Sequence, residues 1–315
     1  MTEDLSLQPQ KRTRLIAHLL AFITIFIWST TYVSTKLLLI NFTPTEIQFF
    51  RLVIAYLALF IVKPGFIKYK NIKEELTFAG AGLCGITLYF GLQNTALIHT
   101  TASNMGVLVS VAPFFTAILS YFLLDKQTIY RRFFIGFVAA IIGIALIGFN
   151  GNVVLELNPL GDIMALIAAL AWAFYSILLK KISAHGYNTI QCTRKIFFYG
   201  ILFLIPILPA LDFQFNLARF LSGSNLFNML FLGLGASALC FVTWNYAVSI
   251  LGPVKTNTYI YLSPVITIIT SVILLKERIT SVAALGVFLI LAGLFISEGK
   301  ILTFNKTKSK KTSEV

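Results

Sequence analysis

The sequence predicts an all-α membrane protein whose ten transmembrane helices form two inverted five-helix repeats. Hydrophobic residues make up 57% of the chain and charged residues only 12%, which excludes an ordinary soluble domain. Apolar runs of about 18 to 22 residues recur along the chain, and each is long enough to cross a bilayer core. The second half of the chain also repeats the order of motifs found in the first half.

We expect ten spans joined by short loops and flanked by two polar, basic tails. The tails cover residues 1–14 and 300–315. Between them lie a first repeat over residues 15–149 and a second over residues 150–299. The ten expected spans cover residues 15–38, 45–62, 76–98, 101–124, 132–149, 159–180, 190–210, 226–249, 254–275 and 281–299.

The repeat is indicated by matched residues that keep the same order in both halves. Each repeat holds five spans, an odd number, so the two must be inverted relative to one another. The matched residues, first half before second, are Trp28 and Trp172, Gln93-Asn94 and Trp244-Asn245, Pro113 and Pro264, Gly136 and Gly286, and Gly143 and Gly293.

The lysines and arginines predict the orientation of the chain. If the N-terminus is cytoplasmic, 20 of the 25 basic residues fall on the cytoplasmic side. We therefore expect a multi-pass protein of the inner (cytoplasmic) cell membrane with both termini in the cytoplasm. Topology then accounts for the net charge of +13, and we expect the lipid bilayer rather than nucleic acid as a partner.

Polar and aromatic side chains recur at matching places in the spans and are the candidates for a solute-binding cavity. Such groups donate hydrogen bonds to a solute and stack on it. Alternatively, the polar ones hold helices together and the aromatic ones form belts at the membrane surface. The candidates are Trp28, Thr31, Tyr32, Arg51, Tyr89, Gln93, Asn94, Asn104, Trp172, Tyr175, Trp244, Asn245 and Tyr259.

Arg51 is the most distinctive of these candidates. It lies about two turns inside the second span, roughly 10 Å from its start. Its counterpart in the second half is Arg194 or Lys195. Two cations that approach a cavity from opposite faces suit an anionic or zwitterionic solute. Alternatively, they reach lipid headgroups or pair with Glu46 or a helix C-terminus.

Prolines and glycines predict where helices bend and where they pack. Pro113 and Pro264 remove a backbone hydrogen bond within their spans, so they form either hinges or static kinks. The glycines of the fifth and tenth spans, at positions 136, 143, 286 and 293, give those spans small faces for close packing.

Several kinds of function are disfavoured by what the sequence lacks. All twelve acidic residues fall in tails, loops or near span ends, so we expect facilitated diffusion or exchange rather than strict proton coupling. There is no Walker-type loop, no metal-ligand cluster and no reactive constellation at one depth. We therefore expect no enzyme activity, no cofactor and no metal.

In its duplicated five-span unit, its proline-containing fourth and ninth spans and the stretch LLKERIT at residues 274–280, the chain resembles the EamA-like branch of the drug/metabolite transporter (DMT) superfamily. The resemblance covers residues 15–299. The first half departs from it at residues 124–128, which read LDKQT, with Asp125 near where the family has glutamate. The resemblance implies small-solute transport by alternating access, with a central cavity between the halves.

We therefore expect a secondary transporter for a small polar metabolite, such as an amino acid, a nucleoside-like compound or a related organic solute. Because both halves lie in one chain, we expect it to function as a monomer. A membrane channel and a structural membrane subunit without transport activity are the alternatives that the sequence leaves open.

Overall fold

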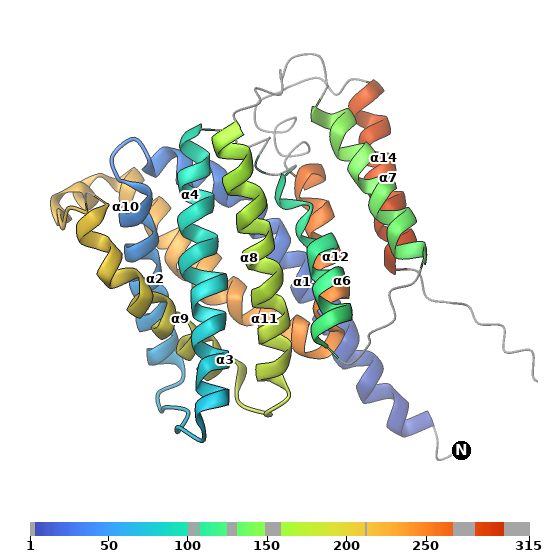
Figure 1. Ribbon diagram of the computed structural model, residues 1–315, viewed down its shortest axis with the longest axis horizontal. Helices are drawn as coiled ribbons and strands as arrows, with labels where there is room; N and C mark the ends of the chain where they lie inside the picture. Colours follow the sequence, from blue (N-terminus) through green and yellow to red (C-terminus); the bar gives the residue numbers. More distant parts are fainter. Residues whose placement is uncertain are drawn as a thin grey trace, which may run out of the picture.

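A computed structural model describes residues 4–99, 105, 108–124, 131–148, 159–211, 213–266 and 281–298. Within these ranges every regular element is a helix, and no strand occurs. Helices satisfy their own backbone hydrogen bonds, which a lipid environment requires. The long helices lie side by side, as Figure 1 shows. The prediction of an all-α membrane protein is confirmed.

The first half begins with a helix that starts well before the first expected span, at Asp4 instead of residue 15. The third span is a continuous run of helix with three parts: an α-helix, a π-helical segment called η1, and a second α-helix. The elements are α1 (Asp4–Leu38), α2 (Pro44–Val62), α3 (Ile72–Gly82), η1 (Leu83–Leu88), α4 (Tyr89–His99), α6 (Ala112–Leu123) and α7 (Arg131–Gly148).

The second half repeats this plan, including a π-helical segment, η4, inside its third span. The offset that matches Gln93 with Trp244 places η1 within η4. The elements are α8 (Pro159–Ser183), α9 (Thr189–Leu204), η2 (Ile205–Ala210), η3 (Leu217–Leu221), α10 (Gly223–Leu230), η4 (Phe231–Leu239), α11 (Cys240–Leu251), α12 (Pro253–Thr258), η5 (Tyr259–Tyr261) and α14 (Ser281–Glu298).

Six helices of the described chain are long and apolar enough to cross a membrane. The count of ten spans stays a prediction, because the expected spans 101–124 and 254–275 include residues outside the described ranges. The six helices are Lys11–Leu38, Pro44–Val62, Ile72–His99, Pro159–Ser183, Thr189–Ala210 and Gly223–Leu251.

The packing of the helices follows the predicted repeat. α1 packs on α11, and in the same way α8, the counterpart of α1, packs on α4. The counterpart helices α2 and α9, α6 and α12, and α7 and α14 pack against each other. An exchange of the two halves about a two-fold axis requires the match between the first two contacts and is compatible with the other three. The inverted repeat itself stays a prediction, and the pairing supports it.

A capping box fixes the start of α2. The Thr43 hydroxyl accepts a hydrogen bond from the Glu46 backbone N–H, and the Glu46 carboxylate accepts one from the Thr43 backbone N–H at 2.8 Å. Pro44 occupies the first turn, where its missing N–H costs nothing. The same carboxylate binds the Arg219 guanidinium at 2.8 Å. This fixed start places Arg51 two turns into the helix.

The two prolines lie near helix starts, which differs from the expected mid-span position. Ser110 and Val111 form a turn, and α6 then begins with Pro113 in its first turn. Pro264 lies in the first turn of helical residues 262–266, directly after the 3₁₀-helix η5. A proline fits a first turn because the N–H it lacks has no partner there. A hinge role for these two residues stays a prediction.

Glycines bring α7 and α14 into close contact, as the sequence predicts. A Cβ atom added to Gly143 would lie 2.5 Å from the Gly286 carbonyl oxygen, and one added to Gly293 would lie 2.4 Å from the Gly136 carbonyl oxygen. The backbones therefore touch at both ends of the contact, and only glycine fits. The two helices form a distinct pair at one edge of the molecule (Figure 1).

Replacing either of these glycines should loosen this helix pair. We expect Gly143→Ala and Gly293→Ala each to lower the free energy of unfolding by about 1–3 kcal/mol, the usual cost of overpacking. Thermal unfolding in detergent, followed by fluorescence, measures the loss. Gly223→Ala is the matched control, because a Cβ atom added at Gly223 meets nothing within 4 Å. Equal melting temperatures for all three variants would contradict the close contact.

Candidate functional site

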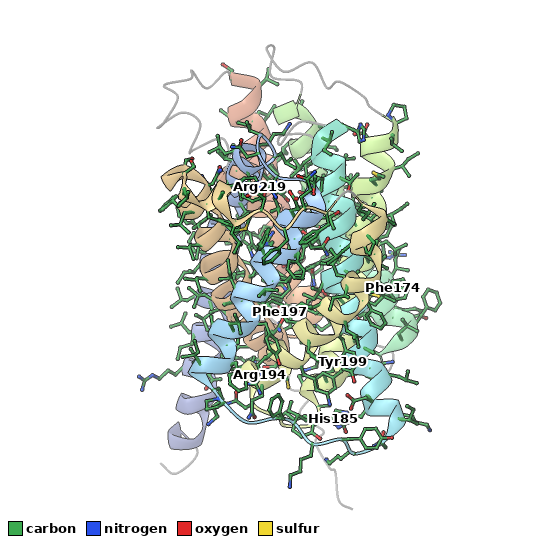
Figure 2. All side chains as sticks on the ribbon, turned by 90° about the vertical axis from the view of Figure 1, so that its left-hand side faces the viewer. Phe174, His185, Arg194, Phe197, Tyr199 and Arg219 are labelled. Carbon is green, nitrogen blue, oxygen red and sulfur yellow. The ribbon has the colours of Figure 1, made fainter. Side chains whose placement is uncertain are left out.

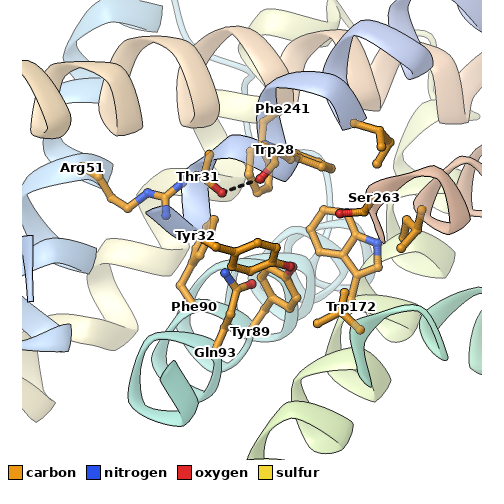
Figure 3. A pocket seen from close by; sticks show the side chains of 13 residues that line it. Trp28, Thr31, Tyr32, Arg51, Tyr89, Phe90, Gln93, Trp172, Phe241 and Ser263 are labelled. Atoms are coloured by element: carbon orange, nitrogen blue, oxygen red, sulfur yellow. Dashed lines mark hydrogen bonds between the residues drawn. The ribbon is translucent and has the colours of Figure 1, made fainter. Parts of the chain in front are cut away.

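A cavity lies between the helices of the bundle. Its walls come from α1, α2 and α4 of the first half and from α8, α11 and η5 of the second half. The helices of both halves therefore enclose a single space, which is where a carrier of two repeats places its site. Figure 3 shows the side chains that line it.

Seven of the thirteen predicted cavity residues line this space. Five others are placed outside its lining, namely Asn94, Tyr175, Trp244, Asn245 and Tyr259. Asn104 falls outside the described residues. The seven that line the cavity are Trp28, Thr31, Tyr32, Arg51, Tyr89, Gln93 and Trp172.

Tyr175 and Asn245 bond to each other instead of facing the cavity. The Tyr175 hydroxyl donates to Asn245 Oδ1 at 2.6 Å, and Asn245 Nδ2 donates to Thr193 Oγ1 at 2.8 Å. All three side chains are buried, so this chain of bonds joins α8, α11 and α9. Asn94 likewise faces the start of α2, where its amide lies 3.4 Å from the Pro44 carbonyl oxygen.

Six residues of the lining were not among the predicted candidates. Five are apolar and carry no sequence signal that separates a cavity wall from a lipid-facing surface. The sixth, Ser263, precedes Pro264, and its position in the matched motif was the one available clue. The six are Ile25, Phe90, Val109, Phe241, Ile260 and Ser263.

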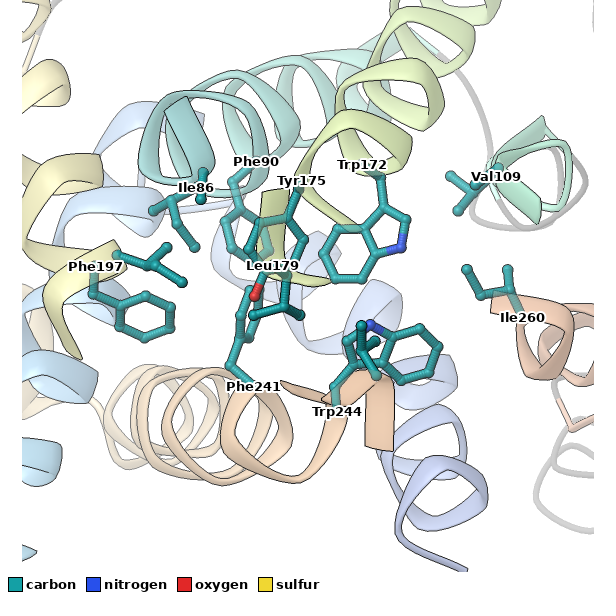
Figure 4. Packing of buried hydrophobic residues seen from close by; sticks show 14 of the residues in the cluster. Ile86, Phe90, Val109, Trp172, Tyr175, Leu179, Phe197, Phe241, Trp244 and Ile260 are labelled. Atoms are coloured by element: carbon teal, nitrogen blue, oxygen red, sulfur yellow. The ribbon is translucent and has the colours of Figure 1, made fainter. Parts of the chain in front are cut away.

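All three tryptophans of the chain meet beside the cavity. The ring centroids of Trp28 and Trp172 lie 5.3 Å apart, those of Trp28 and Trp244 5.1 Å, and those of Trp172 and Trp244 6.0 Å. The Tyr89 ring packs on Trp172 at 4.8 Å. Phe241 lies among these rings (Figure 4). The cavity therefore has one wall made of aromatic faces, which favours a solute with a flat apolar part.

Arg51 brings a positive charge into this apolar setting. Its side chain is 2% exposed, and its guanidinium points toward Thr31 and the cavity (Figure 3). Nε donates to Ser237 Oγ at 2.9 Å, and the guanidinium carbon lies 4.1 Å above the Phe90 ring. Within the described chain no carboxylate forms an ion pair with Arg51. The described chain therefore offers no negative partner to the terminal nitrogens Nη1 and Nη2.

The two π-helical segments hold the side chains around this charge. Gln48 donates from its amide to the Ile86 and Thr87 carbonyl oxygens of η1, at 2.9 Å and 3.1 Å. Trp28 donates from its indole N–H to the Ala236 carbonyl oxygen of η4 at 2.8 Å. A π-helical turn displaces carbonyl groups from the regular α-helical bonding pattern, so side chains can reach them. η1 and η4 thereby fix residues on α2 and α1 that face the centre.

The counterparts of Arg51 lie far from the cavity, near the end of the molecule that holds His185 (Figure 2). Arg194 donates to the Lys63 carbonyl oxygen at 2.6 Å and to the Gly65 carbonyl oxygen, and so it binds the chain after α2. Lys195 forms an ion pair with Glu75 at 2.8 Å. Arg194 thus takes one of the alternative roles that the sequence left open, contact with a helix C-terminus, whereas Lys195 pairs with Glu75 and not with Glu46. Arg51 is the only guanidinium in the cavity lining that the structure describes.

Polar contacts join α1 to the second half at the cavity and on its N-terminal side. They are buried or partly buried and link residues more than 200 positions apart. The α1 residues that line the cavity begin at Ile25, so the contacts of His18 and Thr24 lie toward the N-terminal end of α1, and the contact of Ser29 with Ser263 lies at the cavity itself. The hydrogen-bonded pairs are His18 Nδ1 with the Tyr259 hydroxyl at 2.7 Å, Thr24 with Thr243 at 2.7 Å, and Ser29 with Ser263 at 3.0 Å.

Comparison with known proteins shows which transporters this chain is similar to. The model of the EamA-like transporter family matches residues 15–149 and again residues 159–298. An uncharacterized transporter of Archaeoglobus fulgidus is 27% identical over 90% of this chain and 97% of its own length. A probable terminal-alkyne amino-acid exporter of Streptantibioticus cattleyicolor is 25% identical over 89% of this chain and 92% of its own length.

A solved protein structure has the same fold. It superposes with a TM-score of 0.69 over 91% of this chain and 96% of that one, at 16% sequence identity. At that identity the likeness concerns the fold alone. The two family matches together cover nearly the whole membrane part of the chain, which is therefore a multi-pass membrane protein that belongs to the EamA-like transporter family.

Proposed function

We propose that this chain is a secondary transporter that moves a small polar metabolite by alternating access around the central cavity. The observation that carries the proposal is the cavity itself. It is enclosed by helices of both halves and combines aromatic walls with an arginine, a glutamine and two tyrosine hydroxyls. An amino acid, a nucleoside-like compound or a related organic solute has the size and polarity that such a lining binds.

The packing supports a rocking motion of the two halves. Counterpart helices meet across the molecule, so one half can rotate on the other and expose the cavity to either side in turn. The basic residues predict the orientation of the protein in the membrane. We propose that it lies in the inner membrane of the cell, with the N-terminal end of α1 and both termini in the cytoplasm.

The two sides of the cavity differ in how they are closed. On the α1 side, Thr24 and Ser29 bond to the second half. The repeat matches these two positions with Ala168 and Ala173 on α8, which have no polar side chain to offer. We therefore propose that the hydrogen-bonded pairs form a cytoplasmic gate, and that the described state is closed toward the cytoplasm.

Filling the cavity should stop transport. We expect saturable counterflow of at least one small polar metabolite in proteoliposomes that contain the wild-type chain. Val109→Phe puts a ring into the cavity lining, and overpacking of about 1–3 kcal/mol should weaken solute binding about fivefold to 150-fold. Counterflow of a labelled solute, selected from a panel of amino acids, organic acids and nucleosides, measures the change.

Val138→Phe is the matched control for this cavity-filling variant. Val138 is 54% exposed on the outer face of α7, so the same substitution leaves the cavity unchanged and should leave counterflow unchanged. Flux that does not saturate would favour a channel. A folded, inserted protein that moves no solute of the panel would favour a structural subunit. Equal counterflow rates for both variants would show that the solute does not pass through this cavity.

Weakening the proposed gate should expose the cavity to the cytoplasm. We expect Thr24→Val combined with Ser29→Ala to raise the labelling of a cysteine introduced at Val109, in a background without Cys84, Cys192 and Cys240. Each lost membrane hydrogen bond contributes about 0.6 kcal/mol, so labelling should rise roughly threefold to tenfold. The measurement applies an impermeant thiol reagent to inside-out vesicles.

The control for the gate experiment is Thr77→Val, which removes an exposed hydroxyl that bonds only within its own helix. Its labelling should equal that of the parent protein. Unchanged labelling in the gate variant, or a rise only in right-side-out vesicles, would show that these hydrogen bonds do not close the cytoplasmic side.

A further inference from the structure

We infer that the substrate is a small organic monoanion with a carboxylate, a flat apolar body and a hydrogen-bond donor. This inference rests on the proposed transport function and names the class of solute. Its starting point is the charge balance of the cavity, in which Arg51 is the one cation and no acidic residue of the described chain is part of the lining.

Acidic residues are also missing from long stretches of the membrane-spanning sequence. No aspartate or glutamate occurs between residues 76 and 124, between 163 and 211 or between 213 and 276. Glu46, the acidic residue nearest to Arg51 along α2, is already bound to Arg219. A buried cation without a partner is costly, and a bound anion removes that cost. An anionic solute therefore gains affinity in the cavity that a neutral one lacks.

The geometry of Arg51 favours a carboxylate as the anion. Ser237 accepts the Nε hydrogen bond, so the guanidinium keeps its outer edge, Nη1 and Nη2, for a ligand. Two parallel N–H donors match the two oxygens of a carboxylate in a bidentate pair. Phe90 covers one face of the guanidinium at 4.1 Å, which leaves that edge as the direction of approach. A phosphate dianion would bring a second negative charge that the described lining does not balance.

The same charge balance disfavours a zwitterion. Its carboxylate would pair with Arg51, but its ammonium group would then need a negative partner, and the described lining offers only ring faces and neutral oxygens. A hydroxyl, by contrast, needs only a hydrogen-bond acceptor. A hydroxy acid thus leaves a neutral complex, whereas the matching amino acid leaves a net positive one.

Gln93 supplies the acceptor for this second group. Its side chain is 4% exposed and lines the cavity, and its Oε1 is buried without a hydrogen-bond partner in the described chain. A buried acceptor left without a partner costs about 1–3 kcal/mol, which a donor on the solute recovers. In Figure 3 the rings of Tyr32 and Phe90 lie beside Gln93, and Trp28 and Trp172 line the same cavity.

The three tryptophans make ligand binding measurable without knowledge of the natural solute. Trp28 and Trp172 line the cavity, and Trp244, the third and last tryptophan of the sequence, packs on both, so quenching of tryptophan fluorescence reports on this site. Four probes share one ring and differ in charge: 3-phenyllactate, phenylalanine, 2-phenylethanol and phenethylamine. Purified full-length protein is titrated with each probe.

We expect 3-phenyllactate to bind at least about tenfold more tightly than phenylalanine and 2-phenylethanol, and phenethylamine to bind most weakly. Arg51→Gln should abolish the preference for 3-phenyllactate, whereas Lys255→Gln, which removes an exposed cation, should keep it. The ranking of the four probes needs only the wild-type protein, so it stands even if Arg51→Gln fails to fold.

The outcomes separate this inference from the proposed function. Tighter binding of phenylalanine than of 3-phenyllactate, equal binding of the neutral alcohol, or no response to 3-phenyllactate would each overturn the monoanion assignment. Saturable counterflow of some other solute would still support the transporter. A 3-phenyllactate preference that survives Arg51→Gln in a folded protein would show that Arg51 does not bind the carboxylate.

Discussion

The structure depends on how a membrane helix accommodates one buried guanidinium. Arg51 is nearly inaccessible, lies two turns inside α2 and has a single hydrogen bond from Nε to Ser237. Ser237 lies in η4, at the same level of the chain as the carbonyl that holds Trp28. The π-helical segment thus joins the cation to the aromatic wall. A helix in lipid tolerates such a charge only when it faces a cavity or a partner.

Three other cations of the described chain have partners outside the cavity lining, and two of these partners are carboxylates. Arg219 pairs with Glu46, Lys195 pairs with Glu75, and Arg194 binds backbone carbonyl groups. These contacts lie toward the two ends of the molecule and hold loops to helix ends, as Figure 2 shows for Arg194 and Arg219. The same residue type therefore has a structural role at the ends and, on our proposal, a ligand-binding role at the centre.

The two halves are alike in packing and unlike in polarity. Counterpart helices meet in the pairs that an inverted repeat requires, and α7 and α14 touch through glycines of both halves. The side chains are less symmetric: Arg51 has no counterpart in the cavity, and the α1 side has hydroxyl pairs where α8 has alanines. On our proposal, the similar packing of the two halves allows two states of the transporter, and the unequal contacts decide which state is favoured.

Much of the fold could be predicted because lipid imposes simple rules. Apolar runs predicted the six long helices to within a few residues. The glycines at positions 143 and 293 predicted close packing of the fifth and tenth spans, and the structure shows that these two helices, α7 and α14, pack on each other. Helix starts were less accurate: α1 begins in the expected tail, and Pro113 starts α6 instead of lying at the middle of its span. The bilayer sets the length of a span, but the residue at which a helix starts depends on local preferences, such as that of proline for the first turn.

The site was predictable in part, and the reasons differ from residue to residue. Arg51, Gln93 and Trp172 were identified because polar or large amphipathic side chains deep in a membrane are costly unless they face a cavity or a partner. Tyr175 and Asn245 stood out equally but satisfy each other, and sequence alone does not show which polar groups pair. Phe90 and Phe241 were missed because a ring in a cavity wall and a ring in lipid look the same in sequence.

The most direct test of this account is a structure of the protein bound to 3-phenyllactate. The account predicts the carboxylate on Nη1 and Nη2 of Arg51, the hydroxyl on Gln93 Oε1 and the ring against the wall of Trp28 and Trp172. A ligand bound in the cavity with its carboxylate away from Arg51, or bound outside the cavity altogether, would contradict the central claim that the unpaired guanidinium selects the solute.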